Sequence, residues 1–255
     1  MDTPRPPAGP LPADTTGDWA ERPAQVALLP VGSFEQHGPH LPLTTDTVIA
    51  CTVAQELAAA HPVRLLPPLA FSCSQEHAAW PGTVSLSATT LYAVVRDIAR
   101  SLAAAGARGL VLVNGHGGNY VLRNAVQESA GCGLPMALFP GSADWGAATA
   151  HAGVETSGHS DMHAGELETS ILLHARPELV RPGYEDADHL ADDRRHLLTL
   201  GMGPYTASGV IGRPSLGTAT KGARVLDSLV ASFGEYLAAV EGRSAGPGRT
   251  PGAAR

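Results

Sequence analysis

The sequence predicts an α/β fold organised around a mainly parallel sheet. Segments typical of buried strands alternate along the chain with segments of helical periodicity, which is the pattern of βα units. The length of 255 residues suits one large domain with its own core. With 44% hydrophobic and 16% charged residues, the composition is that of a globular protein and excludes collagen, a coiled coil and a disordered chain. We expect a single domain over residues 25–241.

The two ends of the chain are predicted to lie outside this domain. Residues 1–24 contain six prolines and almost no periodic apolar pattern, so we expect a disordered Pro-rich arm. Residues 242–255 are rich in Gly, Pro and Arg and are expected to form a flexible tail.

Two strands and two helices are predicted in the first half of the domain. Residues 26–31 (VALLPV) suit a buried strand, although Pro30 indicates that it ends there or lies at an edge. Thr45 or Asp46 can cap a helix that stops before Pro62, and residues 63–69 form a second strand. A second helix follows this strand and ends before Gly106. The apolar residues that mark the two helices are Val48, Ile49, Val53 and Leu57, then Leu91, Val94, Val95, Ile98 and Leu102.

The second half continues the alternation. Residues 109–113 (GLVLV) are the clearest central strand, followed by a helix over about 120–130 and a weaker strand over 134–139. Residues 141–162 are expected to form a long loop. Two further helices are predicted, one from near Gly165 toward Pro177 and a packing helix over about 220–240.

Charge and cysteine content limit the partners and the compartment. The formal net charge of −7 and the pI of about 5.8 give no basic field for nucleic acid or anionic lipid, so we expect small-molecule or protein partners. Three cysteines without a CxxC pair indicate a reducing compartment. No stretch approaches the roughly 18 apolar residues of a membrane span. We therefore expect a cytoplasmic protein.

The densest group of potential metal ligands follows the first predicted strand. Glu35, His37, His40 and Asp46 fall within twelve residues, between a strand and a helix start. Catalytic groups of open α/β folds gather at that end of the strands. Carboxylate and imidazole donors suit Zn²⁺, Mn²⁺ or Fe²⁺, and a carboxylate can bridge two ions. The alternative interpretation is a polar turn with a capping Asp and surface histidines.

Three further segments carry side chains suited to chemistry. His116 lies in NGHGGN (114–119), directly after the central strand, where the alternative is a Gly-rich turn with an incidental His. His163, Glu166 and Glu168 lie at a helix start, where the macrodipole alone can explain a carboxylate. Residues 74–83 (SQEHAAWPGT) either line a pocket or form a turn with one buried Trp.

Together these segments resemble the creatininase (creatinine amidohydrolase) family. The matching motifs are GSFEQHGPHLPLTTDT (32–47), EHAAWPGT (76–83), NGHGGN (114–119) and HAGELETS (163–170). The resemblance implies a three-layer α/β/α fold and hydrolysis of a C–N amide bond in a cyclic amide, small amide or peptide. It also implies two divalent ions per subunit that activate water, Zn or Mn with Fe as a further candidate. A homo-oligomer, commonly a hexamer, is implied as well.

The resemblance also implies roles for individual residues. Glu35, His37 and Asp46 match metal ligands, with Asp46 in the bridging position, and His116 matches another ligand. Members that cleave creatinine carry a Glu two residues after that histidine. This chain has Gly118 there, so Glu168 becomes the candidate fifth ligand.

His163 matches a catalytic histidine, and Glu166 can hold its tautomer or serve only as a helix-start carboxylate. Creatinine-cleaving members also carry a tryptophan shortly before that histidine, where this chain has residues 159–161 (HSD), so the resemblance points away from creatinine. One branch, the peptidases that act on the mycofactocin precursor, shares the NGHGGN and HAGxxETS forms and residues 208–212 (SGVIG).

Two rival functions remain open at this stage. A metal-binding or assembly protein of the same fold would bind metal without catalysis, and Gly118 keeps that alternative open. Phosphoester hydrolysis on a dinuclear centre ranks low, because no Arg or Lys lies near the motifs to hold a phosphoryl group.

Overall fold

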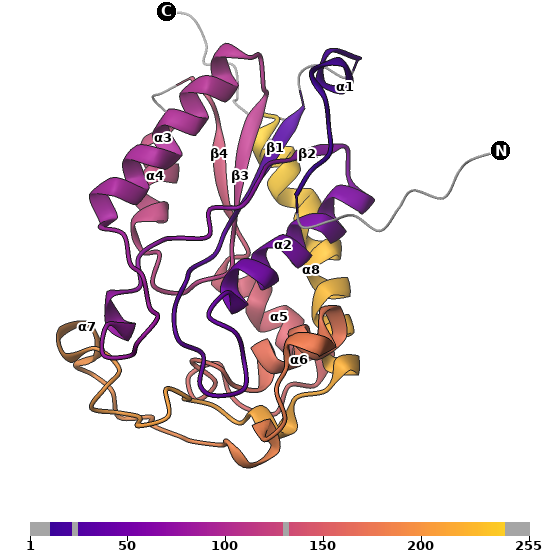
Figure 1. Ribbon diagram of the computed structural model, residues 1–255. Coiled ribbons are helices and arrows are strands. Elements are labelled where there is room, and N and C mark those ends of the chain that lie inside the picture. Colours follow the sequence, from indigo (N-terminus) through magenta and orange to yellow (C-terminus); the bar gives the residue numbers. More distant parts are fainter. Residues whose placement is uncertain (1–10, 22–24, 130–132, 243–255) are drawn as a thin grey trace, which may run out of the picture.

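The computed structural model describes residues 11–21, 25–129 and 133–242. In this part of the chain a four-stranded parallel sheet has the order β2-β1-β3-β4. The strands are β1 (Val26–Val31), β2 (Val63–Leu65), β3 (Gly109–Asn114) and β4 (Met136–Phe139). Helices cover both faces of the sheet, so the predicted three-layer α/β/α fold is confirmed (Figure 1).

The two helical layers are unequal. One face is covered by α3 (Ala88–Ala104) and α4 (Val121–Ser129). The other packs against α2 (Thr45–Ala60), α5 (Ser142–Ala152), α6 (Glu166–Ala175) and α8 (Ala219–Val240). Side chains of β1 alternate between the two cores, because successive residues of a strand point to opposite faces. The whole of β1 is buried, as a strand covered on both sides requires.

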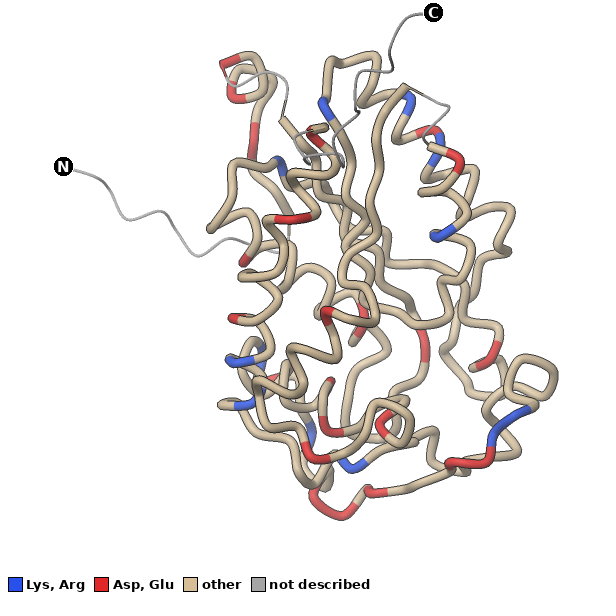
Figure 2. The backbone as a smooth tube through the Cα atoms, turned by 180° about the vertical axis from the view of Figure 1, so that it is seen from behind, with Lys and Arg blue, Asp and Glu red and all other residues tan. Residues whose placement is uncertain are grey.

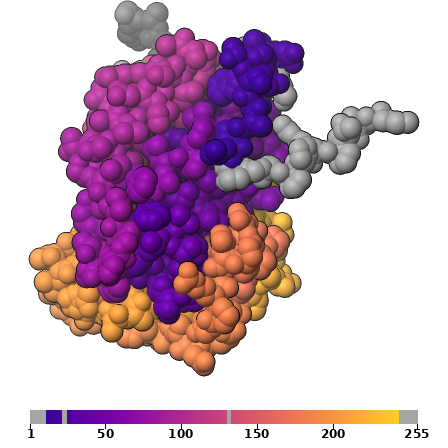
Figure 3. All heavy atoms as spheres, in the orientation of Figure 1, coloured from indigo at the N-terminus to yellow at the C-terminus, as the bar shows by residue number. Residues whose placement is uncertain are grey.

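Short helices and irregular chain complete the domain. These are η1 (Gln75–His77), η2 (Pro177–Leu179), η3 (Tyr184–Asp186), α7 (Leu197–Leu200) and η4 (Pro214–Leu216). The segment from η2 to η4 wraps around the end of the domain to which the strands point, where it meets the loop after β1 (Figures 1 and 3). Loops from both halves of the chain therefore enclose the carboxyl edge of the sheet.

Of the two alternatives predicted from Pro30, the edge position is wrong, whereas β1 does end close to it, at Val31. β1 is a central strand between β2 and β3, and Pro30 stays in register with Val113. The regular pairing of β1 with β2 ends at Leu28 and Leu65, before Pro30 is reached. The Pro30 carbonyl accepts from Leu69 N, which shows that the backbone of Pro30 faces the β2 side. Regular pairing has already ended on that side, so the absent N–H of proline removes no hydrogen bond of the sheet.

The predicted loop over residues 141–162 was also wrong, because it contains α5. Asp144 caps this helix by accepting from Gly141 N, and Gly153 ends it in the left-handed conformation. The helix buries only Ala148 and Ala152 against its surroundings. Small buried residues give no apolar stripe, which is why the helical period was not visible.

Within the predicted arm, residues 11–21 are described and include α1 (Thr16–Glu21). This differs from the expected disorder. Arg64 of β2 lies over the Trp19 ring at 5.2 Å and pairs with Asp14 at 3.3 Å, which attaches the segment to the sheet. Residues 1–10 and 22–24 of the arm, and 243–255 of the tail, lie outside the described residues.

The surface agrees with a protein of mixed charge. Figure 2 shows Lys and Arg interspersed with Asp and Glu along the backbone rather than gathered on one face. Among the helices that the structure describes, none is both long enough and apolar enough to cross a membrane.

Candidate metal centre

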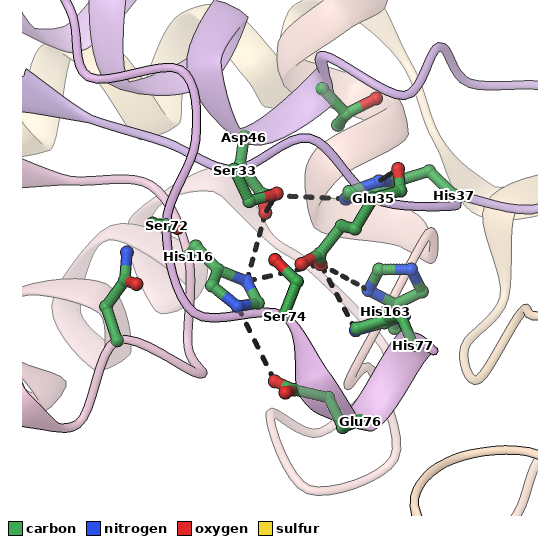
Figure 4. A network of polar contacts seen from close by, with 12 residues as sticks. Ser33, Glu35, His37, Asp46, Ser72, Ser74, Glu76, His77, His116 and His163 are labelled. Atoms are coloured by element: carbon green, nitrogen blue, oxygen red, sulfur yellow. Dashed lines mark hydrogen bonds and ion pairs between the residues drawn. The ribbon is translucent and has the colours of Figure 1, made fainter. Parts of the chain in front are cut away.

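The predicted ligands converge where β1 and β3 end. Glu35 and His37 lie in the loop after β1, Asp46 in the first turn of α2, and His116 directly after β3 (Figure 4). Glu168 joins them from the first turn of α6. The first four side chains are buried, between 0% and 5% exposed, which is unusual for such polar groups without partners.

Close backbone contact brings the loop after β1 against α2. A Cβ on Gly32 would lie 2.3 Å from the Thr47 Cα, so only glycine fits there. The Thr47 hydroxyl donates to the Ser33 carbonyl at 3.0 Å, and the Ser33 hydroxyl donates to Asp46 Oδ2 at 2.7 Å. These bonds fix the Asp46 carboxylate at the centre.

Backbone carbonyls orient the two histidines among these residues. His37 Nδ1 lies 3.1 Å from the Glu35 carbonyl, and His116 Nε2 lies 2.7 Å from the Cys73 carbonyl. A carbonyl can only accept, so each of these nitrogens carries the hydrogen. The second nitrogen of each ring faces carboxylates. His37 Nε2 is 3.1 Å from Asp46 Oδ1, and His116 Nδ1 is 3.0 Å from Asp46 Oδ2.

The carboxylates stabilise a positive charge on or between the two histidine rings. Burial would lower the pKa of His37, but Asp46 and the other carboxylates raise it to about 9. Burial acts likewise on His116, where Glu35 and Asp46 raise the pKa well above its ordinary value. A divalent cation meets the same demand through the ring lone pairs, with the far nitrogens held by carbonyls as is usual for ligating His.

Glu35 gives the clearest test of whether a cation fits. Both of its carboxylate oxygens are buried and accept no hydrogen bond from the residues that the structure describes. The ring nitrogens of His77 and His116 lie 3.1 and 3.2 Å from Oε1, but neither makes a hydrogen bond to it. A buried carboxylate without donors costs several kcal/mol unless a cation compensates it. The residues present therefore fit a metal ion.

The donor atoms form three groups. Glu35, His37 and His163 make one, and the other two share the Asp46 carboxylate. Glu35, Asp46 and His116 make the second group, and His37, Asp46 and Glu168 make the third, with the donor atoms of each group within 4.8 Å of one another. Asp46 directs one oxygen to each histidine. This is the arrangement that a bridging carboxylate between two ions requires.

Glu168 lies at the more open side of the centre. Its Oε2 accepts from Ala164 N at 2.6 Å and is 3.9 Å from His37 Nε2. Ala164 has a positive φ of 50°, a conformation that an alanine rarely adopts and that turns its N–H toward the carboxylate. Burial raises the pKa of Glu168 to about 7, partly offset by His37.

His163 also faces the centre. Its Nε2 donates to the Gln36 carbonyl at 2.6 Å, which leaves Nδ1 with a lone pair 3.9 Å from Glu35 Oε1. The ring lies between those of His37 and His77, tilted to both, with centroids 4.2 and 4.4 Å away. Burial, reinforced by these two neighbouring rings, holds the His163 pKa well below its usual value.

Of the two roles predicted for Glu166, that of orienting His163 is wrong, whereas that of a helix-start carboxylate agrees with its place in the first turn of α6. Its carboxylate accepts from Thr156 N and Oγ1 at 2.8 and 2.7 Å and pairs with Lys221 Nζ at 2.6 Å. The first turn of α6 points this side chain to the far side of the helix, toward α8. The Gln36 carbonyl takes the place that had been expected for Glu166.

Two residues of the fourth motif were missed as members of the centre. His77, only 1% exposed, lies 3.1 Å from Glu35, and Glu76 Oε1 lies 3.5 Å from His116 Nε2. A Cβ on Gly118 would lie 2.1 Å from Glu76 Oε1, so the space beside Gly118 holds the carboxylate of Glu76. The EHAAWPGT motif was the available signal. His40, although buried, lies apart beside Thr169.

Comparisons with known proteins agree with this geometry. The family model described as "Creatininase: Creatinine amidohydrolase" matches residues 15–237. The chain is 39% identical over 216 residues to the mycofactocin precursor peptide peptidase of Mycobacterium ulcerans (strain Agy99), covering 80% of each chain. It is 31% identical over 199 residues to the creatinine amidohydrolase of Pseudomonas putida, covering 68% of this chain and 74% of that protein.

Solved structures show the same fold. A structure described as "Creatininase Mn" superposes with a TM-score of 0.76 at 25% identity, covering 89% of this chain and 96% of the other. A creatininase variant of Zn-Zn type superposes over the same shares with a TM-score of 0.74 at 25% identity.

Proposed function

This chain belongs to the creatininase family, and on that premise we propose that it is a metal-dependent peptidase that hydrolyses a C–N amide bond of a mycofactocin-type precursor peptide. The 39% identity with such a peptidase over 80% of both chains supports the peptide substrate. The observation that carries the proposal is the pair of donor groups joined by Asp46, with the buried Glu35 carboxylate lacking any hydrogen bond from the described residues.

Five side chains would hold the ions. Glu35 and His116 belong to one position, His37 and Glu168 to the other, and Asp46 to both. When bound, divalent ions supply Lewis-acid chemistry, lowering the pKa of water and polarising an amide carbonyl. We propose two ions per subunit, Zn or Mn, with Fe a further candidate; the related Mn and Zn-Zn creatininase structures support this choice.

His163 would transfer the proton. Its low pKa keeps the ring neutral near pH 7, and its Nε2–H is committed to the Gln36 carbonyl. The lone pair on Nδ1 therefore faces the centre, where it can accept a proton from water and pass it to the leaving nitrogen. The contact with Gln36 keeps the hydrogen on Nε2 and holds the ring orientation through both steps.

The test couples metal analysis with hydrolysis. We expect the purified protein to bind two divalent ions per chain and to cleave mycofactocin precursor peptide, with fragments identified by mass spectrometry. Glu35→Gln should lower the metal content and abolish turnover, whereas Glu56→Gln, the same change at an exposed site on α2, should alter neither. Bound metal without hydrolysis of the peptide, of lactams or of formamides would favour a binding protein of this fold.

The assembly state belongs to the same proposal. We propose a homo-oligomer, as the family resemblance implies, and expect light scattering after size-exclusion chromatography to give a multiple of the 26.2 kDa chain, six in the hexameric case. A monomer at micromolar concentration would contradict this part.

A further inference from the structure

Gln36 contacts both histidines that face the centre without belonging to the two Asp46-sharing groups. It lies between Glu35 and His37 in the loop after β1 and is 5% exposed. Its carbonyl accepts from His163 Nε2, and its side-chain amide lies 3.0 Å from His77 Nδ1. His77 and His163 lie side by side at the centre (Figure 4), with ring centroids 4.4 Å apart.

The orientation of the Gln36 amide is determined by its other partners. Gly38 N can only donate, and it lies 2.9 Å from Oε1. The Gly209 carbonyl can only accept, and it lies 3.1 Å from Nε2. Both contacts require the same assignment, with the oxygen toward Gly38 and the NH2 group toward Gly209. The NH2 group is therefore the one that meets His77.

This assignment fixes the tautomer of His77. The Gln36 NH2 group donates, so His77 Nδ1 must accept and carries no hydrogen. The neutral ring then has its hydrogen on Nε2, which faces the centre. This nitrogen lies 3.1 Å from Glu35 Oε1 but without the geometry of a hydrogen bond to it. A nitrogen that carries a hydrogen cannot ligate a metal ion, so His77 presents a hydrogen-bond donor to the centre.

The two neighbouring rings consequently present opposite groups to the centre, one a lone pair and the other an N–H. His163 directs a lone pair to the centre because its hydrogen is held by the Gln36 carbonyl. His77 directs an N–H to the centre because its lone pair is held by the Gln36 amide. One residue thus sets both tautomers, through its backbone and its side chain.

We propose that Gln36 is a positioning residue that holds His77 as its Nε2–H tautomer, and that His77 donates a hydrogen bond to the substrate carbonyl oxygen while His163 acts as the proton acceptor. This inference rests on the proposed amide hydrolysis. His77 keeps its proton throughout, so no further reactant is needed. A preorganised donor at a developing negative oxygen is worth about 10²–10³ in kcat.

The segment 206–212 packs against Gln36 and His163 and holds them in place. Gly209 has a φ of +88°, and a Cβ on it would lie 1.8 Å from Gln36 Oε1, so the segment closes tightly on the amide. Two residues later, Ile211 pairs with His163 through reciprocal backbone hydrogen bonds of 2.9 Å. The SGVIG motif therefore positions both rings, which gives it a role that the metal ligands alone do not explain.

Histidine ring NMR tests the tautomer directly. In ¹⁵N-histidine-labelled, zinc-loaded protein, we expect His77, assigned from the His77→Gln spectrum, to show a protonated Nε2 and a bare Nδ1. Gln36→Glu presents only acceptors to Nδ1, so the hydrogen should move to Nδ1. Gln75→Glu, the same change on an exposed side chain two residues from His77, should leave the tautomer as it is. Gln36→Met, which adds no charge, should give a mixture if the glutamate variant does not fold.

Kinetics test the donor role separately. His77→Leu should lower kcat on the precursor peptide by about 10²-fold or more, whereas His77→Gln, which keeps an N–H near the same place, should recover part of the loss. A bare Nε2 on His77, an unchanged tautomer in both Gln36 variants, or full kcat in His77→Leu would overturn the inference. The NMR result does not require turnover, so absence of peptidase activity with the expected tautomers would count against the proposed function alone.

Discussion

Side chains at the centre are held by backbone carbonyls, which can only accept, and by one donating hydroxyl. Backbone carbonyls fix the hydrogens of His37, His116 and His163, and the Ser33 hydroxyl holds Asp46. Such partners preorganise donor atoms before any ion binds, which reduces the reorganisation that binding would require. The consequences for single substitutions can be stated residue by residue.

Ser33→Ala should weaken metal binding without removing a ligand. The Ser33 hydroxyl is fully buried and donates to Asp46 Oδ2 at 2.7 Å, so its loss frees the carboxylate proposed to bridge the ions. We expect a loss of about 10- to 100-fold in metal affinity, measured by competition with a chromogenic chelator. Ser101→Ala, on the exposed face of α3, provides the control. Unchanged affinity in Ser33→Ala would argue against the bridging position of Asp46.

The ion pair of Glu166 with Lys221 should contribute stability rather than catalysis. Glu166 is fully buried, so Lys221→Met would leave its carboxylate without a counter-charge and should lower the free energy of unfolding by about 3 kcal/mol. Urea denaturation measures this change. Metal content should stay at the wild-type level; its loss would show that the pair supports the centre after all.

The same pair predicts a pH dependence of stability. Burial would raise the pKa of Glu166, but Lys221 and Thr156 outweigh it and lower the pKa below its ordinary value. A lowered pKa contributes stability above the unfolded-state value, and that contribution is lost as the pH falls through the folded-state value. Glu166→Gln should therefore be less stable than wild type at pH 7, with a difference that shrinks on acidification. Denaturation curves from pH 7 to pH 3 measure it, and a constant difference would contradict the assignment.

At the scale of elements, prediction succeeded where periodicity is strong. The helices α2, α3 and α8 and the strands β1 and β3 were expected from their apolar patterns and were found. α5 was missed because its contacts are made by alanines. The motif residues were predicted to share a site, and the structure brings most of them together, whereas Glu166 and His40 lie apart. Gln36, which contacts His77, and Lys221, which pairs with Glu166, lie 41 and 55 residues away from them in the chain, so no local pattern could have predicted these contacts.

Substitutions at two glycines of α8 distinguish the effect of close helix packing from that of intrinsic helix propensity. A Cβ on Gly222 would lie 2.0 Å from the Ser170 carbonyl of α6, whereas one on Gly234 would meet nothing within 4 Å. Gly222→Ala should destabilise by about 1–3 kcal/mol through overpacking, and Gly234→Ala should stabilise by about 0.5–1 kcal/mol. Denaturant midpoints of both variants give the comparison. Equal effects would show that α6 and α8 do not pack as closely as described.

At the scale of the whole molecule, the centre brings together residues from distant parts of the chain. Its residues come from the loops after β1 and β3 and from the first turns of α2 and α6, so one set of candidate ligands connects the sheet to the helical layer. An ion bound there binds only the folded chain, because the unfolded chain does not hold these residues together. Metal binding and global stability should therefore be linked.

Removing the ions should consequently lower the melting temperature of the entire domain. At a free ion concentration 100 times the dissociation constant, binding adds about 2.7 kcal/mol to the free energy of unfolding, which corresponds to roughly 5–10 °C for a chain of this size. Calorimetry with and without a chelator, followed by addition of Zn²⁺ or Mn²⁺, measures the shift. Glu35→Gln should show a much smaller shift, because it removes a carboxylate that no hydrogen bond from the described residues compensates. If wild type and Glu35→Gln respond alike to the chelator, the ion that matters for stability lies elsewhere.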